Sequence, residues 1–257
     1  MVSELRRIVA IIPARMASTR LPGKPLADIA GKPMIQWVYE AARRASRVDD
    51  VIVATPDEEI ADAVAAFDGR AVLTSPDDRS GTDRLAEAAR TLAEVGAALP
   101  SDDDIVLNVQ GDEPLVPPEG IDSLVDALLD SRPPRMTSLM RPITSEEAAD
   151  PNLVKVVVDR AGRALYFSRS PIPYVRSEPP GLSIYGHIGL YGYTVRTLWE
   201  FSRLEPTPLE MAESLEQLRA LENGWRIQML ETGYSPVAVD TEEDLARVRE
   251  LMKVKQA

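Results

Sequence analysis

Short apolar runs alternate with amphipathic stretches through the first half of the chain. The mostly apolar runs, which are expected to be strands, are Ile8–Ile12, Val51–Thr55, Arg70–Leu73 and Ile105–Val109. The amphipathic stretches between them, which are expected to be helices, are Pro33–Ser46, Asp57–Phe67 and Thr82–Val95. Continuous apolar strands that alternate with helices are typical of a parallel sheet covered on both faces. The pattern therefore predicts an α/β fold with a Rossmann-like, mostly parallel sheet flanked by helices.

The second half of the chain has a more mixed pattern. Strands are expected at Met136–Met140, Val154–Asp159, Ala164–Ser168, His187–Tyr193 and Arg226–Glu231, and helices at Leu209–Asn223 and Glu242–Lys253. The proline-rich segment Pro171–Pro180 is expected to be an ordered but irregular loop. The close spacing of the strands favours antiparallel pairing. Since no repeat, low-complexity tract or linker divides the chain, we predict a single domain over residues 1–257 with a smaller β-rich lobe at roughly 134–193.

Composition narrows the possible partners. The formal net charge of −12 argues against a nucleic-acid-binding surface, which normally has a basic excess. The absence of cysteine excludes disulfides and thiolate metal sites. No apolar run approaches the roughly 18 to 20 residues of a membrane span, and the charged N-terminus does not resemble a signal peptide. We therefore expect a cytoplasmic protein with no nucleic-acid or membrane partner, whose basic groups converge only where a small anion binds.

Basic groups gather in the loop Pro13–Lys24, directly after the first predicted strand. The loop combines small residues with Arg15, Arg20 and Lys24. Small residues let backbone N–H groups approach phosphate oxygens closely, and the three cations can neutralise a triphosphate. The spacing matches neither a Walker A motif nor the dinucleotide-binding fingerprint. Because the ligands of parallel sheets collect at the carboxyl ends of the strands, this loop is predicted to bind a triphosphate.

Several motifs follow one another along almost the whole chain. They are Ile11–Leu26, Gly31–Met34, Ser80–Arg84, Asn108–Pro114, Ala164–Pro173, His187–Gly189, Pro208–Glu210, Glu213–Arg219 and Val239–Leu245. Together they resemble the sugar nucleotidyltransferases and, more narrowly, the 3-deoxy-manno-octulosonate cytidylyltransferases. The resemblance implies a nucleotide-diphospho-sugar transferase fold. It also implies an enzyme that joins CMP from CTP to the anomeric hydroxyl of an acidic eight-carbon sugar, with Mg²⁺ as cofactor and pyrophosphate as second product.

The resemblance also implies roles for the loop. Arg15 and Lys24 would hold the triphosphate of CTP, assisted by Ser18 and by backbone N–H groups. The role of Arg20 stays open between a phosphate contact and a salt bridge at the base of the loop. Charge building on the α- and β-phosphates calls for cations and a metal ion more than for a covalent nucleophile.

Two acids match the metal-binding residues of the family, Asp112 and Asp240. Asp112 follows the predicted strand Ile105–Val109, and Asp240 follows a strand predicted at Pro236–Val239. Mg²⁺ prefers one or two carboxylates together with phosphate oxygens and waters. From the residues alone, an N-cap of the last helix is the alternative role for Asp240. With Arg15 and Lys24, these acids form the expected catalytic set.

Both substrates have candidate binding residues by the same resemblance. Those expected to bind CTP, besides the loop, are Ser80, Gly81, Thr82 and Gln110. Those expected to meet the sugar are Arg79, Arg84, Gln110, His187, Glu210, Glu213 and Gln217. In the helix predicted at Leu209–Asn223, the last three would share one face at spacings i, i+3 and i+7. A solvated helix face and a packed histidine are the alternatives for these residues.

One departure from the family pattern concerns the acceptor. Family members commonly carry a basic residue before the histidine, whereas this chain has Gly186 there. A variant acidic sugar, such as 8-amino-3-deoxy-manno-octulosonate or another 2-keto acid sugar, therefore stays open. A nucleotidyltransferase for another acceptor and a non-catalytic nucleotide-binding protein are the rival hypotheses.

The resemblance further suggests a homodimer built on the β-rich lobe. Apolar and aromatic residues around Tyr166, Phe167, Ile172 and Tyr174 could form its interface, or could equally be core.

Overall fold

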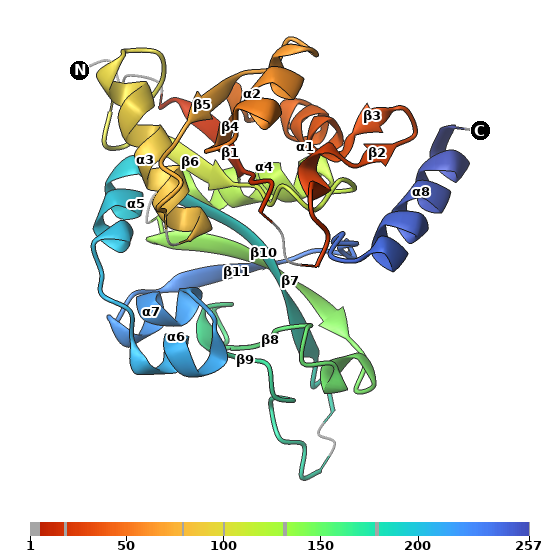
Figure 1. Ribbon diagram of the computed structural model, residues 1–257. Helices are drawn as coiled ribbons and strands as arrows, with labels where there is room; N and C mark the ends of the chain where they lie inside the picture. The colour runs from red at the N-terminus through yellow and green to blue at the C-terminus, as the bar shows by residue number, and fades with distance from the viewer. Residues whose placement is uncertain are drawn as a thin grey trace.

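A central sheet with helices on both faces organises the molecule (Figure 1). The computed structural model describes residues 6–17, 20–78, 80–99, 101–130, 133–177 and 180–256, with side chains as far as residue 253. In these residues the main path of the sheet has the order β11-β7-β10-β6-β1-β4-β5, and β8 and β9 branch from β10. Apart from β10, the strands of this path run in one direction. The mostly parallel α/β sheet predicted from the sequence is confirmed.

The first half of the chain builds the parallel end of the sheet. Its strands are β1 (Ile8–Pro13), β4 (Asp50–Thr55), β5 (Ala71–Leu73) and β6 (Ile105–Asn108). Alternate residues of β1 enter opposite layers, since Val9 and Ile11 belong to one apolar cluster and Ala10 and Ile12 to the other. A strand buried on both faces needs apolar residues at every position, which is why these runs are continuous rather than alternating.

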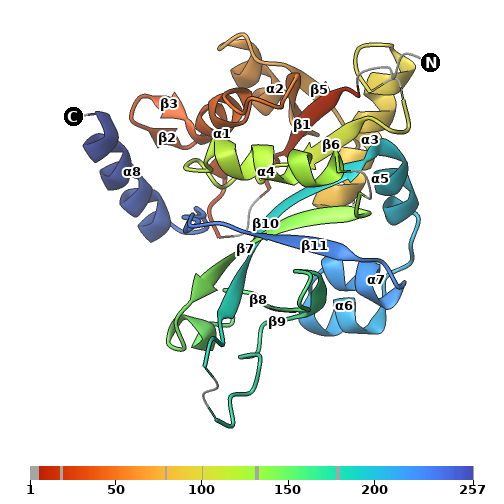
Figure 2. The same ribbon diagram turned by 180° about the vertical axis from the view of Figure 1, so that it is seen from behind.

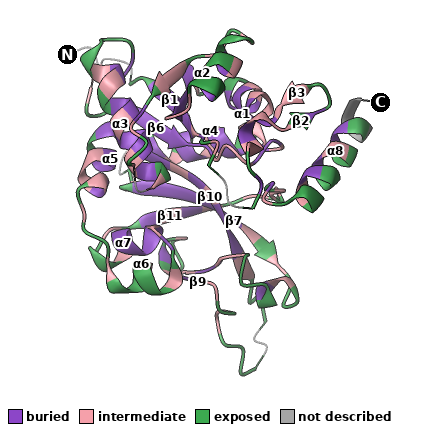
Figure 3. Ribbon diagram, viewed as in Figure 1, coloured by how far each residue is buried: buried purple, intermediate pink, exposed green. Residues whose placement is uncertain are grey.

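Two helical layers cover the faces of this sheet. The helices α1 (Met34–Arg43), α2 (Glu58–Ala65) and α4 (Pro118–Leu128) share one apolar cluster with the sheet. The helices α3 (Gly81–Glu94) and α5 (Val195–Ser202) share the other (Figure 2). Helices α4 and α5 lie in segments that the hydrophobic pattern above leaves unassigned. Both layers bury their apolar faces against the sheet, so the core lies in two slabs (Figure 3).

The second half of the chain extends the same sheet. Its strands are β7 (Met136–Ile143), β8 (Lys155–Val158), β9 (Ala164–Ser168), β10 (Ile184–Thr194) and β11 (Ile227–Glu231). Antiparallel pairs join β10 to β6, β7 and β8, and join β8 to β9. The strands between residues 134 and 193 are thus continuous with the central sheet, and the β8–β9 pair projects below it in Figure 1.

Two local predictions were wrong. The helix expected at Leu209–Asn223 is two short helices, α6 (Pro208–Glu213) and α7 (Gln217–Glu222). They are separated at Ser214, whose backbone is left-handed with φ 52° and ψ 50°. No strand forms at Pro236–Val239, because this segment leaves the sheet edge to reach the last helix. In the described residues 171–177 no regular structure forms, as expected for that loop.

A third apolar cluster holds the last helix, α8 (Glu242–Gln256), against the body of the protein. It joins Leu245 and Val248 of α8 to Leu21, to Val239 and to Ile29, which lies in the small hairpin of β2 (Asp28–Ile29) and β3 (Lys32–Pro33). Leu21 belongs to the basic loop, so the cluster connects that loop with the C-terminal segment.

Candidate active site

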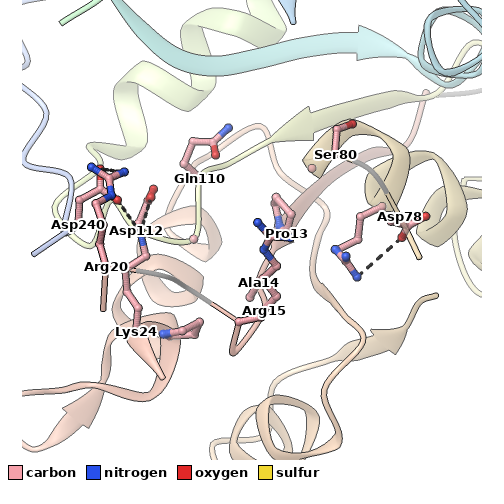
Figure 4. Close-up of a pocket in the computed structure, with 15 residues that line it drawn as sticks. Pro13, Ala14, Arg15, Arg20, Lys24, Asp78, Ser80, Gln110, Asp112 and Asp240 are labelled. Atoms are coloured by element: carbon pink, nitrogen blue, oxygen red, sulfur yellow. Dashed lines mark hydrogen bonds and ion pairs between the residues drawn. The ribbon is translucent and has the colours of Figure 1, made fainter. Parts of the chain in front are cut away.

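A cavity of about 390 Å³ opens at the carboxyl ends of β1 and β6 (Figure 4). Its lining comes from the basic loop, the start of α3, the loop after β6 and the segment before α8. The residues that line it are Pro13, Ala14, Arg15, Ala17, Arg20, Lys24, Pro25, Asp78, Ser80, Gly81, Arg84, Gln110, Gly111, Asp112 and Asp240. The sheet therefore brings all four expected catalytic residues to one cavity.

Backbone hydrogen bonds fix the described parts of the basic loop. Ala14 N donates to Ala54 O at 3.0 Å, and Met16 N donates to the Asp57 carboxylate at 2.7 Å. Gly23 has φ +71°, a backbone conformation that residues with a side chain rarely adopt, and its N–H donates to Met16 O. Lys24 follows at once as the first residue of a short 3₁₀ helix. Ser18, an expected triphosphate contact, lies outside the described residues.

Lys24 lies between the two predicted metal ligands. Its Nζ is 2.8 Å from Asp112 Oδ2 and 3.0 Å from Asp240 Oδ1. Arg20 also contacts Asp240, with Nη2 to Oδ2 at 3.1 Å. Burial acts to lower the pKa of Lys24, but the attraction and hydrogen bonds of both carboxylates outweigh it and raise that pKa above its ordinary value. Lys24 is therefore fully charged at neutral pH.

The fold brings Asp112 and Asp240 together although they lie far apart in sequence. Val239 N donates to Asp112 O at 2.9 Å, which ties the segment before α8 to the loop after β6. Both carboxylates are partly exposed, at 30% and 37%, on the cavity side. Two such carboxylates within reach of a single cation suit Mg²⁺, which takes the rest of its ligands from phosphate oxygens and water. No group of three or more acids or histidines that could hold a metal occurs in the described residues.

Glu113, the acid beside Asp112, has a raised pKa. Glu113 is buried, and burial together with the negative charge of Asp112 raises the pKa of its carboxyl to about 8, although Tyr234 acts in the opposite direction. At neutral pH Glu113 is therefore largely protonated. The negative charge of this loop is concentrated on Asp112.

Close packing sets the path of the loop after β6. A Cβ on Gly111 would lie 2.8 Å from Pro13 O, so only glycine lets this loop pass the end of β1. Gln110 donates from Nε2 to Gly189 O at 2.9 Å. The amide of Gln110 thus connects the cavity to β10, the strand that carries His187.

The opposite wall of the cavity is the start of α3. Ser80 caps this helix by accepting from Asp83 N at 3.1 Å. The carboxylate of Glu216 accepts from Ser80 Oγ at 2.8 Å and from Thr82 Oγ1 at 2.5 Å. Burial raises the pKa of Glu216, against these hydrogen bonds and the charge of Arg219. Glu216 was missed among the candidate residues, although it lies in the matching Glu213–Arg219 motif.

Arg84 is buried and holds the segment before α3. Its Nη1 donates to Thr74 Oγ1 at 2.6 Å and lies 3.7 Å from Asp78. Burial and the nearby Glu87 raise the pKa of Asp78 to about 6, despite the charge of Arg84. Arg84 therefore combines a structural role with its place in the cavity lining. Arg79, the neighbouring candidate, lies outside the described residues.

Comparisons with known proteins show the family of this chain. The family model for cytidylyltransferases matches residues 9–228. A 3-deoxy-manno-octulosonate cytidylyltransferase of Geobacter sulfurreducens is 50% identical over 257 aligned residues, covering 96% of this chain and 99% of that protein. The chain belongs to the 3-deoxy-manno-octulosonate cytidylyltransferase family. A family member from Acaryochloris marina is 46% identical and covers 94% of this chain and 96% of its own length.

Solved structures extend the comparison to three dimensions. The structure of a CMP:2-keto-3-deoxy-manno-octonic acid synthetase complexed with CTP matches with a TM-score of 0.89 at 43% identity. It covers 97% of this chain and 99% of that one. A 4-diphosphocytidyl-2C-methyl-D-erythritol synthase matches with a TM-score of 0.66 at 16% identity, which shows a shared fold alone.

The histidine of the family motif is buried beside the cavity and does not line it. His187 packs edge-on against Phe167, with ring centroids 4.9 Å apart, and its Nε2 lies 2.9 Å from Ser138 Oγ. Ser138 has one proton and lies 2.8 Å from the carbonyl of Leu190. Both contacts are satisfied when Ser138 donates to that carbonyl and His187 donates from Nε2. Burial lowers the pKa of His187 to about 3, so the ring is neutral.

The remaining candidates of the family motif lie on two helices and not on one face. Glu210 in α6 pairs with Arg219 of α7 through two hydrogen bonds. Glu213 accepts from Ser168 Oγ at 2.6 Å and from Arg169 N at 3.0 Å, which fastens α6 to the end of β9. Gln217 is buried at the start of α7. The shared helical face was a wrong prediction, because the left-handed Ser214 ends α6 after Glu213.

A second cavity of about 770 Å³ adjoins the first, since both are lined by Asp78 and Ser80. Glu210, Glu216 and Arg219 line it together with residues after α5. Of the sugar candidates, Glu210 therefore faces this cavity, and Gln110 and Arg84 face the first. Thr82, His187, Glu213 and Gln217 line neither of the two.

The glycine that departs from the family pattern faces away from the histidine. A Cβ on Gly186 would lie 2.9 Å from Ile143 Cγ2 and 3.1 Å from Leu153 Cδ1. Neighbouring residues of a strand point to opposite faces, so a side chain at position 186 would not share the face of His187. The missing basic residue thus removes no cation from the side of the sheet that carries His187.

Proposed function

We propose that this protein transfers CMP from CTP to the anomeric hydroxyl of 3-deoxy-D-manno-octulosonate (Kdo), giving CMP-Kdo and pyrophosphate. The observation that carries the proposal is the convergence of Arg15, Lys24, Asp112 and Asp240 on one cavity at the carboxyl end of the sheet. Relatives that bear this activity in their names are about half identical to the chain over nearly its full length. Such a likeness to family members, with all four polar groups present, also speaks against a non-catalytic nucleotide-binding protein.

The reaction forms one phosphorus–oxygen bond and breaks another. The anomeric oxygen of Kdo attacks the α-phosphorus of CTP, the bond to the bridging oxygen of the β-phosphate breaks, and the proton of the hydroxyl goes to solvent. Arg15 and Lys24 bind the triphosphate and stabilise the charge that builds on the departing pyrophosphate. The start of α3, with Ser80 and Gly81, faces the triphosphate from the other wall of the cavity.

We assign Mg²⁺ as the cofactor, with Asp112 and Asp240 as the protein ligands. When bound, the ion supplies positive charge and a fixed geometry for the phosphate oxygens. The chain's part is to point both carboxylates at the cavity, and the Val239–Asp112 backbone hydrogen bond assists by holding their two segments together.

The position of Gly186 favours Kdo over a variant acidic sugar. A side chain at this position would meet Ile143 and Leu153 too closely unless they moved, on the face away from His187. Position 186 therefore gives no reason to prefer a variant acidic sugar over Kdo. The buried contacts of Glu213 and Glu216 connect α6 and α7 to β9 and α3, so these acids shape the acceptor side as well.

We further propose a homodimer and a cytoplasmic location, where CTP is available. Tyr174 is 89% exposed and Leu165 61% exposed, which leaves apolar surface on and after β9. Phe167 is fully buried against His187 and belongs to the core. No helix of the described chain is long and apolar enough to cross a membrane.

A substrate panel tests the function. Pyrophosphate release is measured with each of CTP, UTP, ATP and GTP, offered with Kdo, 8-amino-Kdo and other 2-keto acid sugars in the presence of Mg²⁺. CTP with Kdo is expected to give the largest kcat/KM. A larger kcat/KM with 8-amino-Kdo would make that sugar the acceptor instead of Kdo. No pyrophosphate release with any pair would contradict the proposal that the protein is an enzyme.

A further inference from the structure

One cation of the basic loop already pairs with both acids assigned to the metal. The ammonium of Lys24 lies within 3.0 Å of an oxygen of each carboxylate, and its side chain is 14% exposed. Arg20 adds a second, exposed cation to Asp240. Because Lys24 bridges Asp112 and Asp240, the two carboxylates of the site are held together by a group of the protein itself.

A divalent ion needs the same oxygens. Mg²⁺ binds carboxylate oxygens at about 2.1 Å, and an ammonium between those oxygens would repel it at close range. The two oxygens that Lys24 contacts are at most 5.8 Å apart, the sum of 2.8 and 3.0 Å. Either Mg²⁺ or the Lys24 ammonium can therefore lie between the two carboxylates, but not both at once.

Lys24 has an alternative anion within reach. Its side chain lines the same cavity as Arg15, where the triphosphate is assigned. Lysine carries its charge on a flexible four-carbon stem, so the ammonium can turn from the carboxylates to a phosphate without moving the backbone. A triphosphate in the cavity would compete with the two acids for this one charge.

We propose that Lys24 is an exchangeable internal cation that closes the metal site until a triphosphate draws its ammonium away. Metal binding at Asp112 and Asp240 is then coupled to nucleotide binding, and by linkage each ligand strengthens the other. Free Mg²⁺ binds the protein poorly on its own, whereas Mg²⁺ and CTP bind well together. The inference rests on the proposed function, since it takes the metal and triphosphate assignments from it.

Metal binding without nucleotide tests the inference separately from activity. Mn²⁺ is titrated into the nucleotide-free protein, and free Mn²⁺ is followed by electron paramagnetic resonance. Lys24→Gln is expected to bind Mn²⁺ at least about tenfold more tightly than wild type. Tenfold corresponds to about 1.4 kcal/mol of binding free energy. Lys24→Arg keeps a cation and is expected to bind as weakly as wild type.

Two controls locate the effect. Lys32→Gln removes another ion-paired lysine, which bonds Glu40 at 2.8 Å outside the cavity, and should leave Mn²⁺ affinity unchanged. Asp112→Asn added to Lys24→Gln should abolish the gain. Equal Mn²⁺ affinity of wild type and a folded Lys24→Gln variant would overturn the inference. If the wild-type protein still released pyrophosphate from CTP and Kdo, the proposed function would hold although the inference on Lys24 had failed.

A second measurement follows the Lys24 ammonium of the wild-type chain, and a variant serves only to assign its resonance. The protein is produced with ¹⁵N-labelled lysine, which leaves each ammonium chemically unchanged, and the Lys24 Nζ resonance is assigned by its loss in Lys24→Arg. CTP with a chelator is expected to shift this resonance, whereas Mg²⁺ alone is expected to leave it in place. A shift with Mg²⁺ alone would show that the ion displaces Lys24 unaided and would contradict the coupling.

Discussion

At the scale of single residues, His187 carries a pH dependence that the fold imposes. Its pKa is about 3 in the folded protein because the ring is buried, against about 6.5 in an unfolded chain. Between these values the unfolded chain binds more protons, so stability is fully present above pH 6.5 and is lost as pH falls toward 3. The loss is at most about 1.4 kcal/mol for each pH unit.

Replacement of His187 tests this loss of stability at low pH. His187→Gln cannot titrate, so the free energy of unfolding of wild type relative to this variant is expected to fall between pH 7 and pH 4.5. Urea unfolding of both proteins across this range measures the difference. A difference that does not change with pH would mean that the ring is accessible to protons in the folded state.

The residue scale also shows where sequence reasoning stops. Lys24, Asp112 and Asp240 could be nominated because each follows the end of an apolar segment or belongs to a family motif. That Lys24 bridges the two acids could not be predicted, because the contact joins segments 88 and 216 residues apart. Glu216 escaped notice for a similar reason, since its partners Ser80 and Thr82 lie more than 130 positions away.

At the scale of elements, the third apolar cluster positions the site. It joins α8 to Leu21 of the basic loop, to Leu115 after Asp112 and to Val239 before Asp240. All three segments that carry Lys24, Asp112 and Asp240 therefore rest on one set of apolar contacts. Asp244 in the first turn of α8 also accepts from Asp240 N at 3.1 Å.

Leucine truncation in α8 tests this positioning. Leu245 is 3% exposed within the cluster, and Leu245→Ala is expected to cost roughly 2 to 4 kcal/mol of local packing. The expected result is a several-fold rise in the Mg²⁺ concentration needed for half-maximal activity. Leu251→Ala makes the same change in the same helix at a 39% exposed position and should have little effect. An unchanged Mg²⁺ dependence in Leu245→Ala would exclude the positioning role.

Element prediction succeeded where the hydrophobic period was clear. Mostly apolar runs identified β1, β4 and β6, which are buried on both faces, and also the short edge strand β5. The helix at Leu209–Asn223 failed because apolar spacing continues across Ser214, where the backbone turns left-handed. The pairing of β8 with β10, and of β9 with β8, was likewise not predictable in detail, because the local hydrophobic pattern does not say which strands pair.

At the scale of the whole molecule, one sheet serves two substrates. Its parallel end presents the basic loop and Asp112, while β10 runs antiparallel between β6 and β7 and carries His187. Gln110 bonds across from the loop after β6 to β10, and Glu216 bonds from α7 to α3. These two bridges connect the lining of the cavity to β10 and to α7.

The central claim is that Asp112 and Asp240 hold the Mg²⁺ that activates CTP. The most direct measurement compares Mg²⁺-dependent pyrophosphate release from CTP and Kdo by wild type and by Asp112→Asn, with Asp103→Asn, an exposed acid away from the cavity, as control. The account predicts a fall in kcat of at least about a hundredfold in Asp112→Asn alone, because metal charge stabilisation is worth several kcal/mol. A normal rate in folded Asp112→Asn would contradict it.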